Sequence, residues 1–289
     1  MIDALTELLF PDHNVRGAYV DLRGGIAQML GWRSYAPDVA HLLGQSLAAA
    51  PLLASHSKFD GRISIQFQGA GPVKLLVTQI DAQFELRGMA KAAPDAHGGL
   101  QDLLKDGLLA LLLEPSRGAQ HYRALVPVEG ATLGEALENY FSRSEQLETF
   151  IRLAAAPERF CGLMLQALPP RQGQADAQGW EHLRTLAGTL TEAEMLEVDG
   201  MTLLHRLFHA EDRRILDPRP VRLACRCSHA SISNMLLSLG EKELEPLIEE
   251  RGKVDVTCEF CGREYSYTDL EVRSLFAAAR SGPENQVIQ

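Results

Sequence analysis

Apolar and polar residues alternate along several stretches of the first 170 residues, a pattern typical of half-buried β-strands. Residues 62–67 (RISIQF) show it clearly, and Gly69, Gly71 and Pro72 then indicate a turn into a second strand. The predicted strands are residues 15–22, 62–67, 73–80, 83–89, 108–114, 121–128, 149–154 and 163–168.

Two helices are expected among these strands. Pro37 suits the first turn of a helix over residues 37–56, in which Pro51 introduces a kink or a break. Thr132 is the expected N-cap of a helix that runs to Ser144, with Glu135 completing a capping box. Many strands with few helices predict an α+β domain, residues 1–170, built on a largely antiparallel sheet.

Residues 171–222 are expected to form a helical linker region after a polar, turn-rich boundary at 171–179. Three short helices are predicted at residues 180–190, 191–196 and 201–209 from apolar side chains spaced three and four apart. We interpret this apolar stripe as a surface that docks on the main domain, with a functional binding face as the alternative. The stripe consists of Trp180, Leu183, Leu186, Leu190, Leu203, Leu204, Leu207 and Phe208.

Residues 223–289 are expected to form a separate small module. Helices are predicted at 231–239 and 243–250, where Gly240 and Gly252 act as stops. Two strands, a last helix with Thr268 as its cap, and a frayed polar tail complete the module. The strands are residues 253–257 and 263–267, the helix is 269–280 and the tail is 281–289.

Four cysteines cluster in this module as two close pairs, Cys225 with Cys227 and Cys258 with Cys261. Thiolates suit the four tetrahedral positions of structural zinc, and a CxxC turn followed by Gly262 has the form of a zinc knuckle. The CxC half needs a local bend, because side chains two apart on a straight strand point to the same face. The sequence therefore predicts one zinc ion held by these four thiolates.

Three competing roles for the cysteines fit the sequence less well. The first is four buried structural cysteines without a metal, a role that gives no reason for two closely spaced pairs. A thioredoxin-like CxxC needs a helix after it, whereas a strand is predicted here. A nucleic-acid reader needs a basic surface, but residues 221–289 hold eight Lys and Arg against eleven Asp and Glu. Arg222, Arg226 and Arg263 either offset the charge of the thiolates or are ordinary surface residues.

Composition sets the context for this site. The 289-residue chain has a formal net charge of −10, which disfavours nucleic acid as a partner. The start, MIDALTELLF, lacks the basic segment of a signal peptide, and the longest apolar run is far too short to span a membrane. A cytoplasmic protein without membrane contact is expected, in which cysteine clusters indicate metal or redox chemistry more than permanent disulfides.

The cysteine pattern resembles that of the heat shock protein 33 family of redox-regulated chaperones. CxC, thirty residues and CxxC near the C-terminus form the most specific part of the likeness. Further similar stretches span most of the chain, although Cys161 stands where the family's strand has a glycine, and we expect it to be a buried core thiol. These stretches are residues 15–17, 58–61, 68–72, 138–147, 162–168 and 207–227.

The resemblance implies an ATP-independent holdase that is largely inactive when reduced and zinc-bound. On oxidation, Cys225 would pair with Cys227 and Cys258 with Cys261, zinc would leave, and the module and linker would unfold. Unfolding client proteins would then be bound, by a homodimer, for hand-over to ATP-dependent chaperones. Rings closed by cysteines two and three apart are short and strained, which suits a reversible switch.

Two other functional classes remain open on the sequence alone. One is a constitutive zinc-stabilised binding or scaffold protein without redox switching. The other is an enzyme, which we do not expect, because no catalytic triad, phosphate loop or HExxH motif is present and the nine histidines are scattered.

Overall fold

The computed structural model describes residues 3–24, 33–55, 60–115, 122–169 and 177–280. The chain divides into two compact units, Met1–Ala224 and Cys225–Gln289. Among the described helices, none is both long enough and apolar enough to cross a bilayer. The predicted tail at 281–289 and the polar boundary at 171–176 lie outside the described residues.

The strands of the first unit form two sheets. In the first sheet β1, β2, β9 and β8 follow one another in antiparallel order, and β10 and β11 lie on the outer edge of β1. The bounds are β1 Ala4–Phe10, β2 Val15–Leu22, β8 Thr149–Ala156, β9 Arg159–Ala167, β10 Arg214–Ile215 and β11 Arg219–Pro220.

The second sheet has the order β12-β5-β4-β3-β6-β7, and its pairs are antiparallel except for β12 with β5. The predicted α+β class with largely antiparallel pairing is therefore confirmed, as two sheets rather than one. The bounds are β3 Gly61–Gln68, β4 Val73–Asp81, β5 Glu85–Ala92, β6 Leu108–Pro115, β7 Tyr122–Pro127 and β12 Arg222–Leu223.

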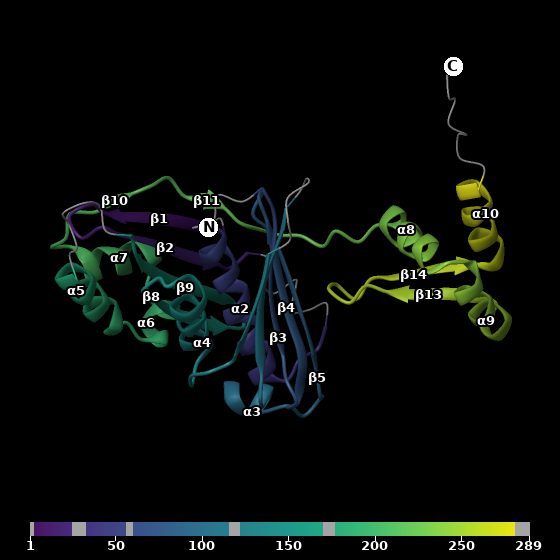
Figure 1. The fold of residues 1–289 in the computed structure, drawn as a ribbon, viewed down its shortest axis with the longest axis horizontal. Coiled ribbons are helices and arrows are strands. Elements are labelled where there is room, and N and C mark those ends of the chain that lie inside the picture. The colour runs from purple at the N-terminus through teal and green to yellow at the C-terminus, as the bar shows by residue number, and fades with distance from the viewer. Residues whose placement is uncertain (1–2, 25–32, 56–59, 116–121, 170–176, 281–289) are drawn as a thin grey trace, which may run out of the picture. The chain divides into compact units, whose positions relative to one another are not determined.

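Helix α2 (Pro37–Ser55) lies between the two sheets and is buried on nearly every side (Figure 1). Small residues allow this close approach, since a Cβ on Gly44 would meet the ring of Phe160 at 2.6 Å and one on Gly88 would meet Leu47 at 2.9 Å. The helix continues through Pro51 without the break that the sequence suggested. A helix that is apolar all round is stable in such a position because both sheets cover it.

Three helices of the linker region cover the opposite face of the first sheet: α5 (Ala177–Gly188), α6 (Glu192–Glu197) and α7 (Gly200–Phe208). Ala18 and Val20 of β2 face the α2 core, whereas Val15 and Tyr19 face these helices, as strand alternation requires. The predicted docking of the apolar stripe on the main domain is confirmed, because most of its side chains are buried there.

The second unit contains three helices, α8 (His229–Leu239), α9 (Glu241–Arg251) and α10 (Asp269–Arg280), and one hairpin, β13 (Lys253–Thr257) with β14 (Glu264–Thr268). Gly240 and Gly252 end the first two helices as predicted, and Thr268 caps the third. The core is small. It consists of Ile232, Leu236, Leu244, Val254, Tyr265, Tyr267, Val272 and Phe276.

Several predicted elements have different bounds. The helix after Thr132 is α4 (Leu133–Tyr140), and a π-turn, Phe141–Glu145, replaces its last part. Thr132 caps it through the Glu135 amide, but the Glu135 carboxylate accepts from the amide of Ala131, so the expected reciprocal capping box is wrong. Strand β1 and the short helix α3 (Leu100–Leu104) were not predicted.

The strand predicted at 83–89 begins at Glu85. The Asp81 carboxylate accepts hydrogen bonds from the amides of Gln83 and Glu85, which closes a turn with Phe84 at φ 61°. The strand predicted at 263–267 is shifted by one residue, because the Arg263 carbonyl accepts from the Cys258 amide and belongs to the cysteine turn.

Candidate metal centre

The four cysteine sulfurs of the second unit lie within 4.8 Å of one another. The Sγ atoms of Cys225 and Cys227 are 3.4 Å apart, those of Cys225 and Cys258 are 3.6 Å apart, and those of Cys227 and Cys261 are 3.3 Å apart. These separations exceed the ~2.05 Å of an S–S bond, so none of the four sulfurs is joined to another in a disulfide. The fold thus brings together all four predicted ligands.

The CxxC half is held by a tight backbone turn. The Cys258 amide donates to the Arg263 carbonyl at 2.9 Å, and the Gly262 amide donates to the Cys258 carbonyl at 2.8 Å. Gly262 has φ 69°, a left-handed conformation that favours glycine. The glycine therefore relieves the backbone as the sequence predicted, and both sulfurs point to one side of the turn.

The CxC half lies in an irregular segment between β12 and α8. Residues 224–228 are not part of a strand, and the two sulfurs of this half come within 3.4 Å of each other, as the sequence required. Ser228 then caps α8 by accepting from the Ser231 amide, which fixes the chain direction immediately after Cys227.

The two thiols of the CxC half have different environments. Burial raises the pKa of the Cys225 thiol well above its usual range. Burial also acts on Cys227, but hydrogen bonds from Tyr265, Cys261, Cys225 and Cys258 lower the pKa of that thiol to about 7. The Cys227 thiol is therefore partly ionised near neutral pH before any metal binds.

The residues present fit a zinc ion. Four sulfurs at a Zn–S length of about 2.3 Å lie about 3.8 Å apart in a tetrahedron, close to the separations here. The Tyr265 hydroxyl is buried and interacts with the Cys227 sulfur. A thiolate bound to a cation retains negative charge that this hydroxyl can stabilise. Tyr265 was not predicted as part of the site, because its contact with Cys227 joins segments that are far apart in the sequence.

The arginines near the cluster take different positions. Arg263 is exposed, and its pKa is raised by the Tyr265 hydroxyl and then by the charges of Cys227 and Cys261. It therefore interacts with the thiolates while remaining at the surface. Arg222 belongs to β12 in the first unit.

Cys161 lies in the first unit and is fully buried on β9. Its Sγ lies 3.3 Å from the Met195 carbonyl, and burial raises the pKa of this thiol to about 12. The prediction of a buried core thiol is confirmed.

Comparison with known proteins identifies the family. The family model described as "Hsp33 protein" matches residues 3–268. The chain belongs to the Hsp33 family. The "33 kDa chaperonin" of Azotobacter vinelandii is 42% identical over 287 residues, covering 97% of this chain and 96% of that protein. The "33 kDa chaperonin" of Pseudomonas aeruginosa PAO1 is 40% identical, with 97% of each covered.

Members of the Hsp33 family also share the fold. The crystal structure of the Thermotoga maritima 33 kDa chaperonin, titled a heat shock protein 33 homolog, has a TM-score of 0.81 to this chain. It is 21% identical and covers 96% of this chain, with 99% of its own length matched. The family resemblance inferred from the cysteine pattern is therefore confirmed over nearly the whole chain, and the chain is a chaperone of this family.

Proposed function

We propose that this protein is a redox-regulated, ATP-independent holdase whose switch is the four-cysteine cluster. Family membership supports the chaperone class. The observation that carries the redox part is the convergence of Cys225, Cys227, Cys258 and Cys261 within 4.8 Å. Four thiols at this separation can bind one soft cation when reduced, and they can form disulfides when oxidised.

In the reduced state the four thiolates hold one zinc ion. Zinc supplies a crosslink between the CxC segment and the CxxC turn. The second unit needs such a crosslink, because its core contains eight buried apolar and aromatic residues in a unit of about 65 residues, a size that is marginal without a staple. Structural zinc contributes roughly 10–16 kcal/mol of apparent binding free energy in small peptides.

Oxidation forms the pairs Cys225–Cys227 and Cys258–Cys261. For each pair, one hydrogen peroxide molecule accepts two electrons from the two thiolates and two protons from solvent, and it leaves as two waters while the S–S bond forms. Two disulfides leave no thiolate in the cluster for the cation, so the zinc is released and the second unit loses its crosslink. Sequence neighbours are expected to pair, because short loops close at the lowest entropic cost.

Loss of the second unit's fold then exposes client-binding surface. We propose that the linker, residues 171–222, unfolds with the module at 223–289 while residues 1–170 stay folded. The stripe that α5 and α7 bury against the first sheet would become accessible to unfolding proteins. The active form would be a cytoplasmic homodimer that hands clients to ATP-dependent chaperones.

The direct test measures zinc, free thiols and disulfide connectivity before and after peroxide treatment with gentle heating. Reduced protein should contain one zinc per chain and, once denatured, five titratable thiols. Oxidised protein should have lost the zinc and four thiols, and peptide mapping should recover Cys225–Cys227 and Cys258–Cys261. Cross-pairs such as Cys227–Cys261, whose sulfurs are 3.3 Å apart in the folded unit, would contradict the proposed pairing.

The other candidate is a constitutive zinc-stabilised binder. The same four thiols support it, since they fit a structural site equally well. Peroxide distinguishes the two, because a constitutive binder would retain both zinc and thiols or would lose its fold without gaining chaperone activity.

A further inference from the structure

Helix α6 is the linker helix with the least apolar anchoring. Met195 is its one fully buried side chain, whereas α5 and α7 each bury several against the first sheet. A helix of six residues is also too short to be stable by itself. The docking of α6 therefore depends on contacts other than the burial of apolar side chains.

Two side chains of β9, here called the α6 clamp, hold the last turn of this helix. The Arg159 guanidinium donates from Nη1 to the Leu196 carbonyl at 2.7 Å, and the Cys161 thiol donates to the Met195 carbonyl at 3.3 Å. Arg159 and Cys161 are two residues apart on the strand, so they point to the same face of the sheet. Carbonyls in the last turn of a helix have no partner amide within the helix. The α6 clamp supplies the missing donors.

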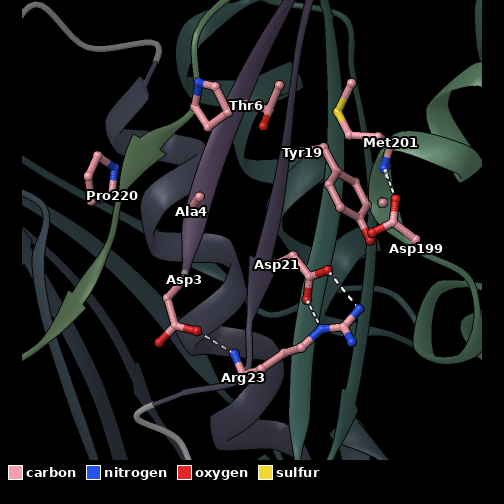
Figure 2. A pocket seen from close by; sticks show the side chains of 11 residues that line it. Asp3, Ala4, Thr6, Tyr19, Asp21, Arg23, Asp199, Met201 and Pro220 are labelled. Carbon is pink, nitrogen blue, oxygen red and sulfur yellow. Dashed lines mark hydrogen bonds and ion pairs between the residues drawn. The ribbon is translucent and has the colours of Figure 1, made fainter. Parts of the chain in front are cut away.

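Asp21 of β2 fixes the direction of the Arg159 guanidinium. Its carboxylate accepts from Nε at 3.0 Å and from Nη2 at 2.7 Å, and this two-point contact leaves Nη1 for Leu196. The Arg159 side chain is only 7% exposed. Figure 2 shows that the Asp21 carboxylate also pairs with Arg23, at 3.1 Å. Two guanidiniums and one carboxylate leave a net positive charge beside the C-terminal end of α6, where the helix dipole favours a cation.

We infer that Arg159, oriented by Asp21, is a positioning residue of the switch: its hydrogen bond to Leu196 keeps α6 docked and determines how readily the linker is released. The inference rests on the proposed function, because it concerns the step between the loss of zinc and the release of the linker. The α6 clamp lies in the first unit, whereas the four clustered cysteines lie in the second. Removal of the clamp should therefore release α6 without any change in the cluster.

The charge of Arg159 makes this contact strong enough to matter. A hydrogen bond from a charged donor to a carbonyl shifts an equilibrium by about tenfold or more. Methionine at this position would have no donor for the Leu196 carbonyl, which would be left buried without a partner while α6 stays docked. Asp21 would keep its contact with Arg23. Arg159→Met therefore favours the undocked helix and leaves no unpaired carboxylate on the sheet.

The test compares full-length, reduced, zinc-bound variants by hydrogen exchange at the amides of α6 and by suppression of client aggregation. Arg159→Met should speed exchange at the Met195 and Val198 amides by about tenfold or more. The same variant should suppress aggregation while it retains one zinc and four reduced cluster thiols. Arg159→Lys keeps the charge but not the two-point contact with Asp21, so its effect on both measurements should be smaller.

Arg62→Met is the matched control. Arg62 pairs with Glu114 at 2.6 Å between β3 and β6, in the same unit but in the second sheet. The control therefore removes an arginine–carboxylate pair without removing a donor to α6, and it should leave exchange at α6 and the activity of the reduced protein unchanged. Slow exchange at the β3 amides in each variant shows that the first unit remains folded. Should Arg159→Met unfold this unit, Arg159→Lys decides by the same criteria.

Three results would overturn the inference. The first is exchange at α6 that is as slow in Arg159→Met as in the unmodified protein, and the second is an equal effect of Arg62→Met. The third is a freed α6 in a reduced variant that still fails to suppress aggregation, although the oxidised unmodified protein does so. If the oxidised unmodified protein holds no client, the proposed function itself fails. Hydrogen exchange at α6 still decides whether Arg159 holds the helix, because that measurement needs no client.

Discussion

Cys225 and Cys227 are two residues apart, yet the pKa values of their thiols shift in opposite directions. Burial raises the pKa of Cys225, whereas the hydrogen bonds to Cys227 bring the pKa of its thiol to about 7. Tyr265 contributes one of those hydrogen bonds from the hairpin that follows the CxxC turn. The four ligands could be predicted from the sequence, because the two cysteines of each pair lie only two or three residues apart. The distribution of charge among the thiols could not, because it depends on contacts made across the folded unit.

At the residue scale, the metal site is tested by two cysteine substitutions. Cys258→Ser should abolish tight zinc binding, because three thiolates and a neutral hydroxyl form a far weaker site for this cation. Cys161→Ser should keep one zinc per chain, since this thiol lies buried in the other unit. Metal analysis of carefully reduced protein provides the readout. Equal zinc in Cys258→Ser, or no zinc in the unmodified protein, would exclude the assigned ligands.

Helices and strands with a regular apolar pattern could be predicted from the sequence. Short strands that form only by pairing with the edge of a sheet could not. The α10 helix and the β13 strand have the predicted bounds, because their apolar spacing and flanking residues are local signals. The two-residue strands β10, β11 and β12 lie in a segment that contains Pro218 and Pro220 and has no periodicity. They exist because β1 and β5 present open edges, and that information lies more than a hundred residues away in the chain.

The linker elements are also tied to the main sheet by a charged cluster. The Glu211 carboxylate, which is 11% exposed, contacts His13 Nε2 at 2.8 Å and His182 Nε2 at 2.9 Å. His13 lies in the turn between β1 and β2, and His182 lies on α5. The hydrogen bonds from His182 and His13 lower the pKa of Glu211. One carboxylate, just after the end of α7, thus contacts both helix α5 and the turn between β1 and β2.

At the element scale, Glu211→Gln should destabilise the first unit by about 0.5–1.5 kcal/mol at neutral pH. A carboxyl whose folded pKa is depressed adds stability that is present above its unfolded pKa of about 4.3 and is lost as pH falls through the folded value. The difference between variant and unmodified protein should therefore vanish in acid. Urea unfolding followed by tryptophan fluorescence measures it, with the exposed Glu197→Gln as control. A difference that persists at low pH would refute this role for the charge.

The whole molecule combines two units with unequal means of stabilisation. The first has two large apolar clusters, on either face of the β1–β2–β9–β8 sheet. The second has one small cluster beside four thiols. A change in thiol chemistry should therefore unfold the second unit while the α2 core survives. This inequality is the physical basis of the proposed control by oxidation.

Light scattering of a heat-unfolding client tests the central claim most directly. Oxidised, zinc-free protein and reduced, zinc-bound protein are compared at equal concentration and without ATP. We expect the oxidised form to suppress aggregation and the reduced form to do so poorly, and renewed reduction with added zinc should restore the poor activity. Equal suppression by both forms would instead identify a constitutive binder, and no suppression by either form would contradict the holdase function altogether.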